Sequence, residues 1–356
     1  MQDGRGGASR RQVMGGALGL AAAATGGTAA AQGAPTAPPP ARAADAPILK
    51  TIPRTGESVP AIGLGTYQTF DLLPGMPRDH LQEVVRQAWE GGARVFDTSP
   101  LYGASEVNVG AFKAALGLDR GMFITNKIWS TGEFLGDDSH ARRSMEQSQL
   151  RLWREKIDAF QCHSLVNVDV VVPLLKAWKK EGRIRYVGAT HHEPAYFGIL
   201  ADWVEKGDLD LVQVHYSILE RRAEERVLPA AQAKGTAVLV NMPLEKARLM
   251  KLVEGQPLPD FAAEFGARSW AQFFLKWVIA HPAITCAIPA TANPAHAADN
   301  MGALYGPLPD AGMRERMRRH VEGLPGFADL PKVPWYPGKS YPGLIARARN
   351  ELKARG

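Results

Sequence analysis

Residues 184–215 of the chain read IRYVGATHHEPAYFGILADWVEKGDLDLVQVH. Two short runs rich in β-branched and apolar residues, 184–190 and 209–215, flank an amphipathic stretch at 193–206. Gly207 follows this stretch directly, where a glycine commonly ends a helix in the left-handed conformation. The segment therefore predicts a strand, a helix and a second strand. Strands joined through a helix lie parallel in one sheet, with a right-handed crossover.

The same alternation continues in both directions along the chain, and we count eight strand–helix units. The predicted strands lie at 61–66, 94–97, 122–127, 157–163, 184–190, 209–215, 237–242 and 285–290. The predicted helices lie at 81–90, 105–116, 139–153, 168–181, 193–206, 220–234, 269–281 and 294–304. Eight units in about 250 residues predict a closed eight-stranded parallel (β/α)8 TIM barrel of the α/β class. An open doubly wound sheet is the alternative.

Two shorter segments refine this prediction. Residues 48–60 predict a hairpin ahead of the barrel, which would cover its bottom. Gly63-Leu64-Gly65-Thr66 ends the first strand but lacks the third glycine of the dinucleotide-binding fingerprint. We therefore do not expect a Rossmann-type site there.

The first 47 residues differ in composition from the rest. Arg10 and Arg11 precede a short run of Gly, Ala and Leu, and Ala29-Ala30-Ala31 follows as a small-residue cleavage pattern. This order predicts a twin-arginine signal peptide at 1–31, too short for a stable membrane span. Residues 32–47, rich in Ala and Pro, predict a flexible tether, and 48–356 a single barrel domain with a C-terminal tail. We expect export by the bacterial twin-arginine machinery, to the periplasm or beyond.

The composition excludes several classes of protein. With 45% apolar and 22% charged residues among 356, the chain is neither disordered throughout nor fibrous. Its formal charge of +6 falls to +4 if cleavage removes three arginines and one aspartate, and the basic residues are scattered, so we expect no nucleic-acid partner. The two cysteines exclude a disulfide framework and a four-cysteine metal site. Cys162 and Cys286 fall on predicted strands, and we expect buried free thiols.

Polar side chains stand at the ends of three neighbouring predicted strands. Asp97 ends one strand, Lys127 the next, and His163 the third, while Tyr102 follows Asp97 by five positions. The carboxyl ends of barrel strands meet on one face, so these side chains are expected to converge. Each has an ordinary structural explanation alone, but the four together indicate a catalytic site.

The four side chains suit the reduction of a carbonyl group. A tyrosine has a pKa near 10, too high for efficient proton transfer at neutral pH, and the Lys127 ammonium would lower the pKa of Tyr102. Asp97 would supply the counter-charge that a buried ammonium needs. His163 would orient the substrate carbonyl while Tyr102 protonates its oxygen, and no metal is needed.

At these positions the chain resembles the aldo-keto reductase family, over residues 48–304. The motifs that carry the resemblance are Gly63–Thr66, the block from Asp97 to Gly103, Asn126-Lys127-Ile128-Trp129, Cys162-His163, and Ile288-Pro289-Ala290-Thr291 with the later Pro294, His296 and Asn300. The resemblance implies an eight-stranded barrel with NADP(H) bound across the strand ends. It implies that Tyr102 is the general acid/base, that Lys127 and Asp97 adjust the pKa of Tyr102, and that His163 orients the carbonyl.

The resemblance also implies residues for the cofactor. They are Gly65, Thr66, Asp97, Thr190, His191, Gln213, Met242, Pro243, Leu244, Thr291, His296 and Asn300. For the substrate, Tyr67 and Trp129 lie just beyond predicted strand ends and are expected, with His163 and Phe70, to wall the pocket. The tail from residue 323 onward contains Pro334-Trp335-Tyr336-Pro337 and is expected to drape over the pocket mouth.

The chain departs from the family pattern at three places. Thr190-His191 replaces a Ser-Asn pair. After the seventh strand, where many members place a Tyr that stacks on the nicotinamide, the chain has Asn241-Met242-Pro243-Leu244, so stacking would be lost or replaced by an apolar contact from Met242. Ala290 and His296 stand where Lys and Arg often face the 2′-phosphate of NADP, and a neutral His cannot clamp a phosphate as Arg does. Lys246 and Arg248 in the preceding loop would either compensate for the missing cations or simply be solvated. NADP(H) is our first choice, with NAD(H) or dual use open.

Two functions follow. The first is an exported NAD(P)H-dependent oxidoreductase acting on aldehyde or ketone carbonyls or the corresponding alcohols. The alternative is a barrel that binds a dinucleotide but turns over slowly, as a redox sensor or partner-binding module, because free NADPH is not expected outside the cytoplasm. The complete set of Asp97, Tyr102, Lys127 and His163 favours the enzyme.

Overall fold

The computed structural model describes residues 46–129 and 137–355. The predicted signal peptide at 1–31, and the predicted tether at 32–47 except its last two residues, lie outside this part of the chain. Within it, no helix combines the length and the apolar character needed to cross a membrane.

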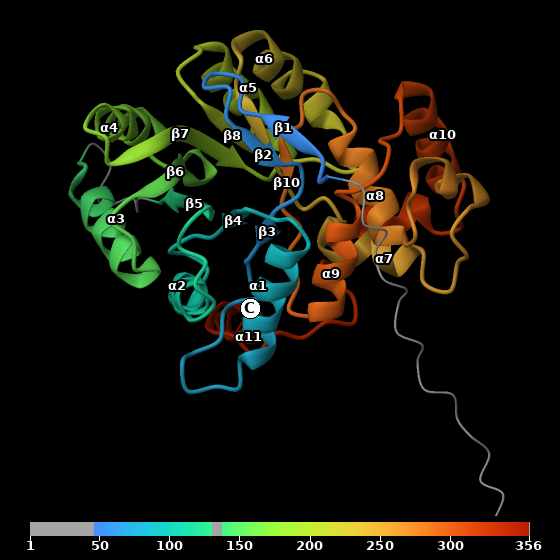
Figure 1. Ribbon diagram of the computed structural model, residues 1–356, viewed down its shortest axis with the longest axis horizontal. Coiled ribbons are helices and arrows are strands. Elements are labelled where there is room, and N and C mark those ends of the chain that lie inside the picture. Colours follow the sequence, from blue (N-terminus) through green and yellow to red (C-terminus); the bar gives the residue numbers. More distant parts are fainter. Residues whose placement is uncertain (1–45, 130–136, 356) are drawn as a thin grey trace, which may run out of the picture. The chain divides into compact units, whose positions relative to one another are not determined.

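Eight parallel strands form the centre of the molecule in the order β3 to β10 (Figure 1). They are β3 (Leu64–Gly65), β4 (Val95–Asp97), β5 (Phe123–Ile128), β6 (Ile157–Cys162), β7 (Ile184–His191), β8 (Leu211–His215), β9 (Ala237–Asn241) and β10 (Cys286–Ala287). Parallel bridges from Ile62 to Ala287 and from Gly65 to Ala290 join the first strand to the last. The predicted closed barrel is therefore confirmed, and the open sheet is excluded.

Glycine at position 65 permits this closure. Its backbone N–H donates to the Pro289 carbonyl at 3.0 Å. A Cβ added there would lie 2.7 Å from the Ile288 carbonyl oxygen, closer than a side chain tolerates. The glycine motif of the first strand thus serves barrel closure.

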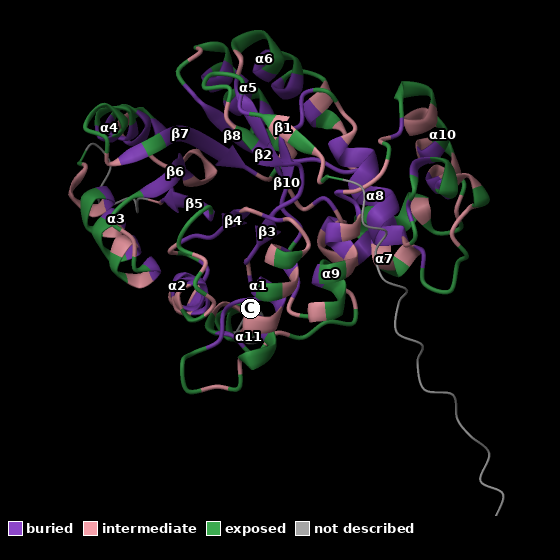
Figure 2. Ribbon diagram, in the orientation of Figure 1, coloured by how far each residue is buried: buried purple, intermediate pink, exposed green. Residues whose placement is uncertain are grey.

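Helices surround the strands and turn their buried faces toward them (Figure 2). Those that follow the strands are α1 (Asp79–Glu90), α2 (Ser105–Ala115), α3 (Ser139–Leu152), α4 (Val168–Lys180), α5 (Phe197–Glu205), α6 (Val227–Lys234), α8 (Trp270–Ile279) and α9 (Pro294–Gly302). Additional helices are α7 (Arg248–Leu252), α10 (Ala311–Glu322) and α11 (Leu344–Arg355). Gly182, Gly207 and Gly235 follow α4, α5 and α6 with φ of 73°, 79° and 63°, the predicted left-handed stops.

Two predicted helices are shorter than expected because single 3₁₀ turns replace their first residues. The turn Pro194–Tyr196 precedes α5, and the turn Arg222–Glu224 precedes α6. Proline at the first position of a turn is compatible with its fixed φ, and the chain continues from each 3₁₀ turn into the α-helix. Both helices therefore begin later in the sequence, at Phe197 and Val227, than the periodicity predicts.

A hairpin closes the amino-terminal end of the barrel. Strands β1 (Leu49–Thr51) and β2 (Ser58–Pro60) pair antiparallel, as predicted. Ile52 and Val59 of this hairpin pack with Val95, Phe123 and Tyr186 in one apolar cluster. The hairpin covers the bottom, so the carboxyl ends of the strands remain open. Both cysteines are buried and free in the barrel wall, and burial raises the pKa of both thiols.

Candidate active site

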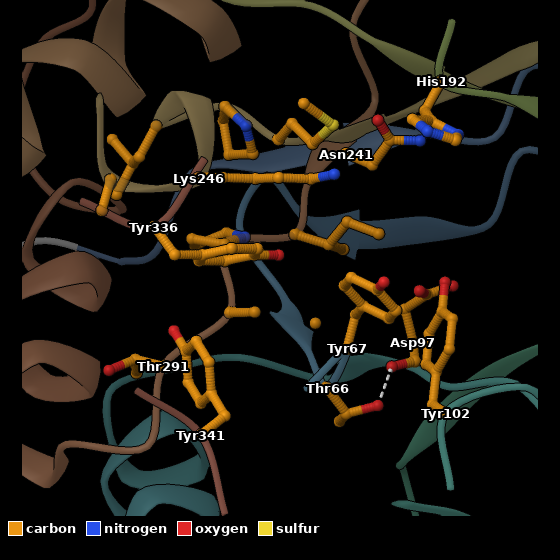
Figure 3. Close-up of a pocket in the computed structure, with 18 of the residues that line it drawn as sticks. Thr66, Tyr67, Asp97, Tyr102, His192, Asn241, Lys246, Thr291, Tyr336 and Tyr341 are labelled. Atoms are coloured by element: carbon orange, nitrogen blue, oxygen red, sulfur yellow. Dashed lines mark hydrogen bonds between the residues drawn. The ribbon is translucent and has the colours of Figure 1, made fainter. Parts of the chain in front are cut away.

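A cavity of about 700 Å³ lies at the carboxyl ends of the strands (Figure 3). Fifteen of the residues predicted for the site line it: Gly65, Thr66, Tyr67, Asp97, Tyr102, Lys127, His163, Thr190, Gln213, Met242, Pro243, Leu244, Thr291, His296 and Asn300. They come from loops and strand ends all around the barrel, which explains why residues far apart in sequence meet here.

Lys127 and Asp97 form a buried ion pair at the floor of this cavity. The Lys127 ammonium donates to Asp97 Oδ1 at 2.7 Å and to the Thr98 carbonyl at 2.8 Å. Thr125 Oγ1 donates to the same carboxylate oxygen at 2.5 Å. Burial lowers the pKa of Lys127, and Asp97 opposes this effect. The Asp97 carboxylate therefore favours the charged form of Lys127 at a buried position, where desolvation alone would favour the neutral amine.

Tyr102 lies beside this pair. The Lys127 ammonium is 5.0 Å from the centroid of the Tyr102 ring, and Tyr102 is buried, with 9% of the residue exposed. Burial raises the pKa of Tyr102 well above its usual value, and Asp97 adds to the effect. The net shift is therefore opposite to the predicted lowering, because the effect of burial is larger than that of the nearby Lys127 ammonium. The phenol is protonated at neutral pH, the form that can donate a proton.

His163 completes the group. Its ring centroid lies 5.9 Å from that of Tyr102, edge-on, and its Nδ1 is 3.2 Å from Ser99 Oγ. Burial lowers the pKa of His163 well below its usual value, and the charge of Lys127 adds to this. The imidazole is therefore neutral, with Nε2 free of the Ser99 contact.

Comparison with known proteins identifies the family of the chain. The model of the aldo/keto reductase family matches residues 61–317. The chain belongs to the aldo/keto reductase family. It is 29% identical over 221 residues to L-galactose dehydrogenase of Arabidopsis thaliana, and the aligned region covers 59% of this chain and 68% of that protein. It is 28% identical over 235 residues to NADH-specific methylglyoxal reductase of Escherichia coli, covering 60% and 70%.

A solved structure shows the same similarity. The crystal structure of an aldo/keto reductase from Klebsiella pneumoniae in complex with NADP and acetate matches with a TM-score of 0.62 and 26% identity. The match covers 75% of this chain and 93% of that one.

The polar groups of this aldo/keto reductase cavity fit a dinucleotide. Gln213, whose Nε2 lies 3.5 Å from Asp97 Oδ2, and Thr190 line the cavity. Asn241 Oδ1 is buried without a hydrogen-bond partner in the described structure. An orphaned acceptor of this kind suits an N–H or O–H group of a ligand. Thr291, His296 and Asn300 supply neutral hydrogen-bonding groups elsewhere in the same cavity.

Three predicted contacts lie outside the cavity. His191 is the last residue of β7, and its ring stacks on Tyr196 with centroids 4.1 Å apart. Successive side chains of a strand point to opposite faces, so Thr190 faces inward and His191 outward. Trp129 does not line the cavity either. Phe70 is fully buried and packs edge-on against Phe112 in the core.

Several other residues line the cavity although the sequence did not predict them for the site. His192, one position beyond the strand, lines the cavity in place of His191. The tail contributes Tyr336, Lys339, Tyr341, Ile345 and Arg349. The tail therefore lies against the pocket, as predicted. In the sequence of this aldo/keto reductase, the proline–aromatic run at 334–337 indicated this position.

Of the two suggested compensating cations, one reaches the cavity. Lys246 lines it, with its side chain between Tyr336 and Asn241 in Figure 3. Arg248 instead pairs with Glu245 and donates to the Leu330 carbonyl at 3.3 Å. Arg248 thus ties its loop to the tail and does not face the ligand space.

Proposed function

We propose that the protein is an NAD(P)H-dependent oxidoreductase that reduces aldehyde or ketone carbonyls, or oxidises the corresponding alcohols, with Tyr102 as general acid/base. One observation carries the proposal: a buried, protonated phenol lies beside a buried Lys127–Asp97 pair and a neutral imidazole in one cavity. Membership of the aldo/keto reductase family supports it.

Tyr102 and Lys127 would serve proton transfer, and His163 would orient the substrate. The reduced cofactor, when bound, supplies the hydride that reaches the carbonyl carbon. Tyr102 donates its proton to the carbonyl oxygen, and the phenolate that forms is stabilised by the nearby Lys127 ammonium. His163 Nε2 can donate to the same oxygen if Nδ1 accepts from Ser99, and so aligns it with Tyr102. Alcohol oxidation uses the same groups in reverse.

For the cofactor, we propose NADP(H) first, with NAD(H) as the alternative. The Klebsiella pneumoniae neighbour binds NADP, while the Escherichia coli relative is named NADH-specific, so both occur among similar proteins. Gln213, Thr190 and Asn241 would hold the nicotinamide end. Thr291, His296 and Asn300 would hold the adenosine end.

We also propose export by the twin-arginine route, on the basis of Arg10, Arg11 and the small-residue segment after them. The test is cell fractionation of the full chain and of a variant with Arg10→Lys and Arg11→Lys. Retention of the variant in the cytoplasm, with the unchanged chain outside it, is the expected result. Equal distribution of both would contradict export by this route.

The enzymatic proposal is tested by steady-state oxidation of NADPH and NADH with a panel of aldehydes and quinones. Tyr102→Phe is expected to lower kcat by at least about a hundredfold, because it removes the proton donor. Equally low rates in both proteins would contradict the enzyme. With tight dinucleotide binding, they would favour the alternative of a redox sensor or partner-binding module.

A further inference from the structure

Two cationic side chains face the same wall of the cavity. The Lys246 ammonium lies 3.3 Å from the centroid of the Trp335 ring and 5.8 Å from that of Tyr67. The Arg349 guanidinium lies 5.7 Å from the same Tyr67 centroid. Both side chains line the cavity, although they come from the loop after β9 and from α11, about a hundred positions apart.

Neither cation has a carboxylate partner among residues 46–129 and 137–355, where no Asp or Glu oxygen lies within 4.0 Å of either one. The neighbouring carboxylate, Glu245, is already occupied. It accepts from Ser217 at 2.6 Å, lies 2.5 Å from His215 Nε2, and pairs with Arg248. Lys246 is therefore held by aromatic faces alone, an arrangement that stabilises a cation only modestly.

The two cations lie near the proposed proton donor. The ring of Tyr67 packs edge-on against that of Tyr102, with centroids 4.9 Å apart. In Figure 3 the ammonium end of Lys246 lies toward Asn241 and Tyr67, while Thr291 and Tyr341 lie on the other side of the view. The positive charge thus stands at the substrate end of the cavity.

We propose that Lys246 and Arg349 form an anion subsite in the substrate pocket, and that the preferred substrate is a carbonyl compound bearing a carboxylate. The inference rests on the proposed function and adds the substrate class to it. A carboxylate held between the two cations would place the other end of a small molecule beside Tyr102 and His163. Arg and Lys together provide several donors for one carboxylate, and the partial burial of Lys246 strengthens its contact, whereas Arg349 is exposed.

The electrostatics of the free protein support the subsite. Burial lowers the pKa of Lys246 to about 7, and Arg349 and Arg248 add to the effect, whereas Glu245 and Glu193 oppose it. Burial lowers the pKa of His192 to about 4, and the Lys246 ammonium across the pocket adds to this effect. Tyr67 and Tyr336 also face it. A bound carboxylate would restore the charge of Lys246, so binding near pH 7.5 is expected to take up a proton.

The first test compares two aldehydes that differ in one charge, 4-carboxybenzaldehyde and 4-methylbenzaldehyde. The measured quantity is the ratio of their kcat/KM values in wild type, Lys246→Met and Lys246→Arg. We expect Lys246→Met to lower this ratio about tenfold, mainly through KM, and Lys246→Arg to restore most of it. Lys176→Met is the matched control, because Lys176 is a surface residue of α4 paired with Asp208. An unchanged ratio in Lys246→Met would overturn the proposal.

The second test separates the substrate from the cofactor, whose phosphates are the other source of negative charge. Calorimetry gives the Kd of NADPH for wild type and Lys246→Met, and the proton uptake when 4-methylbenzoate binds the NADP-loaded protein in two buffers. We expect a similar NADPH affinity, and a proton uptake that Lys246→Met abolishes. A tenfold loss of NADPH affinity with an unchanged aldehyde ratio would assign the ammonium to a cofactor phosphate and overturn the proposal.

The neutral aldehyde keeps the two proposals distinguishable. If Tyr102→Phe abolishes reduction of 4-methylbenzaldehyde while Lys246→Met leaves the ratio unchanged, the anion subsite fails and the proposed function stands. If Tyr102→Phe leaves that reduction unchanged, the proposed function fails, and the calorimetric result alone decides whether an anion binds.

Discussion

Asp71 and Ile345, 274 positions apart in the sequence, are joined by a hydrogen bond of 2.7 Å from the Ile345 backbone N–H to Asp71 Oδ2. The other oxygen of this buried carboxylate accepts from the Ala104 backbone N–H at 3.0 Å. Asn108 fixes the backbone on both sides of Asp71, donating to the Phe70 and Leu72 carbonyls at 2.7 Å each. One side chain therefore links the loop after Tyr102 to the start of α11.

The glycines around Asp71 depend on this link. Gly103 has φ of 61°, and a Cβ there or at Gly343 would collide with the Asp71 side chain. Both backbones approach the carboxylate closely only because neither carries a side chain. The tail that lines the pocket is thus attached to the segment that carries Tyr102.

Asp71→Ala is expected to loosen the tail and to slow turnover. The change leaves two backbone N–H groups without an acceptor, at a cost of about 1–3 kcal/mol each. Hydrogen exchange followed by mass spectrometry should show faster exchange over residues 343–349, and kcat should fall. Asp310→Ala is the control, because Asp310 caps the distant α10 by accepting from Met313 at 2.7 Å. Equal exchange in the tail of both variants would contradict the link.

Lys127→Met is expected to destabilise the fold as well as to abolish carbonyl reduction. The substitution leaves the Asp97 carboxylate buried without its partner, which typically costs about 3–5 kcal/mol in the free energy of unfolding. Adding Asp97→Asn removes the unpaired charge and should recover part of that loss, but not the activity. Urea unfolding of the two single variants and the double variant measures the coupling. Additive losses would show that the pair contributes little to stability.

The barrel and the meeting of Asp97, Tyr102, Lys127 and His163 were predictable, because both depend on local patterns. Each strand is a short apolar run, and its end can be located to within a residue or two. His191 shows the limit of that accuracy: one position along a strand turns a side chain from the inside to the outside. Here β7 extends through His191, so His192 faces the cavity in its place.

The remaining features depend on contacts between distant parts of the chain. No local pattern links Asp71 to Ile345, or places Lys246 against Trp335. The protonated state of Tyr102 likewise follows from its burial in the folded barrel, whereas the sequence pattern predicted only a lysine beside it. A proline–aromatic run indicates that a tail packs on something, but the surface beneath it is defined by the folded barrel.

The rate of reduction is expected to be nearly independent of pH between about 6 and 9 for a neutral aldehyde. Tyr102 has a raised pKa, so its proton-donating form persists throughout this range and is lost only above it. His163 has a lowered pKa, so it stays neutral above pH 6 and becomes charged only at lower pH. Alcohol oxidation needs the phenolate and should accelerate as pH rises. Profiles of kcat in both directions measure this. A decline in the reduction rate centred near pH 7 would contradict the raised pKa of Tyr102.

Lys339 is expected to determine the preference for NADPH over NADH. Ala290 and His296 offer no fixed positive charge, but Lys339 of the tail lines the same cavity as Thr291 and His296. Burial lowers the pKa of His296, and the charge of Lys339 adds to this effect. An ammonium so placed would compensate for the basic residues missing from the late segment. We expect Lys339→Met to raise the Kd of NADPH about tenfold and to leave that of NADH nearly unchanged, since only NADPH carries the 2′-phosphate.

Lys332→Met is the control, because Lys332 lies on the same tail and pairs with Asp329 outside the cavity. Calorimetric titration with both dinucleotides measures the effect, and an equal loss of affinity for the two would assign Lys339 a general role in holding the tail.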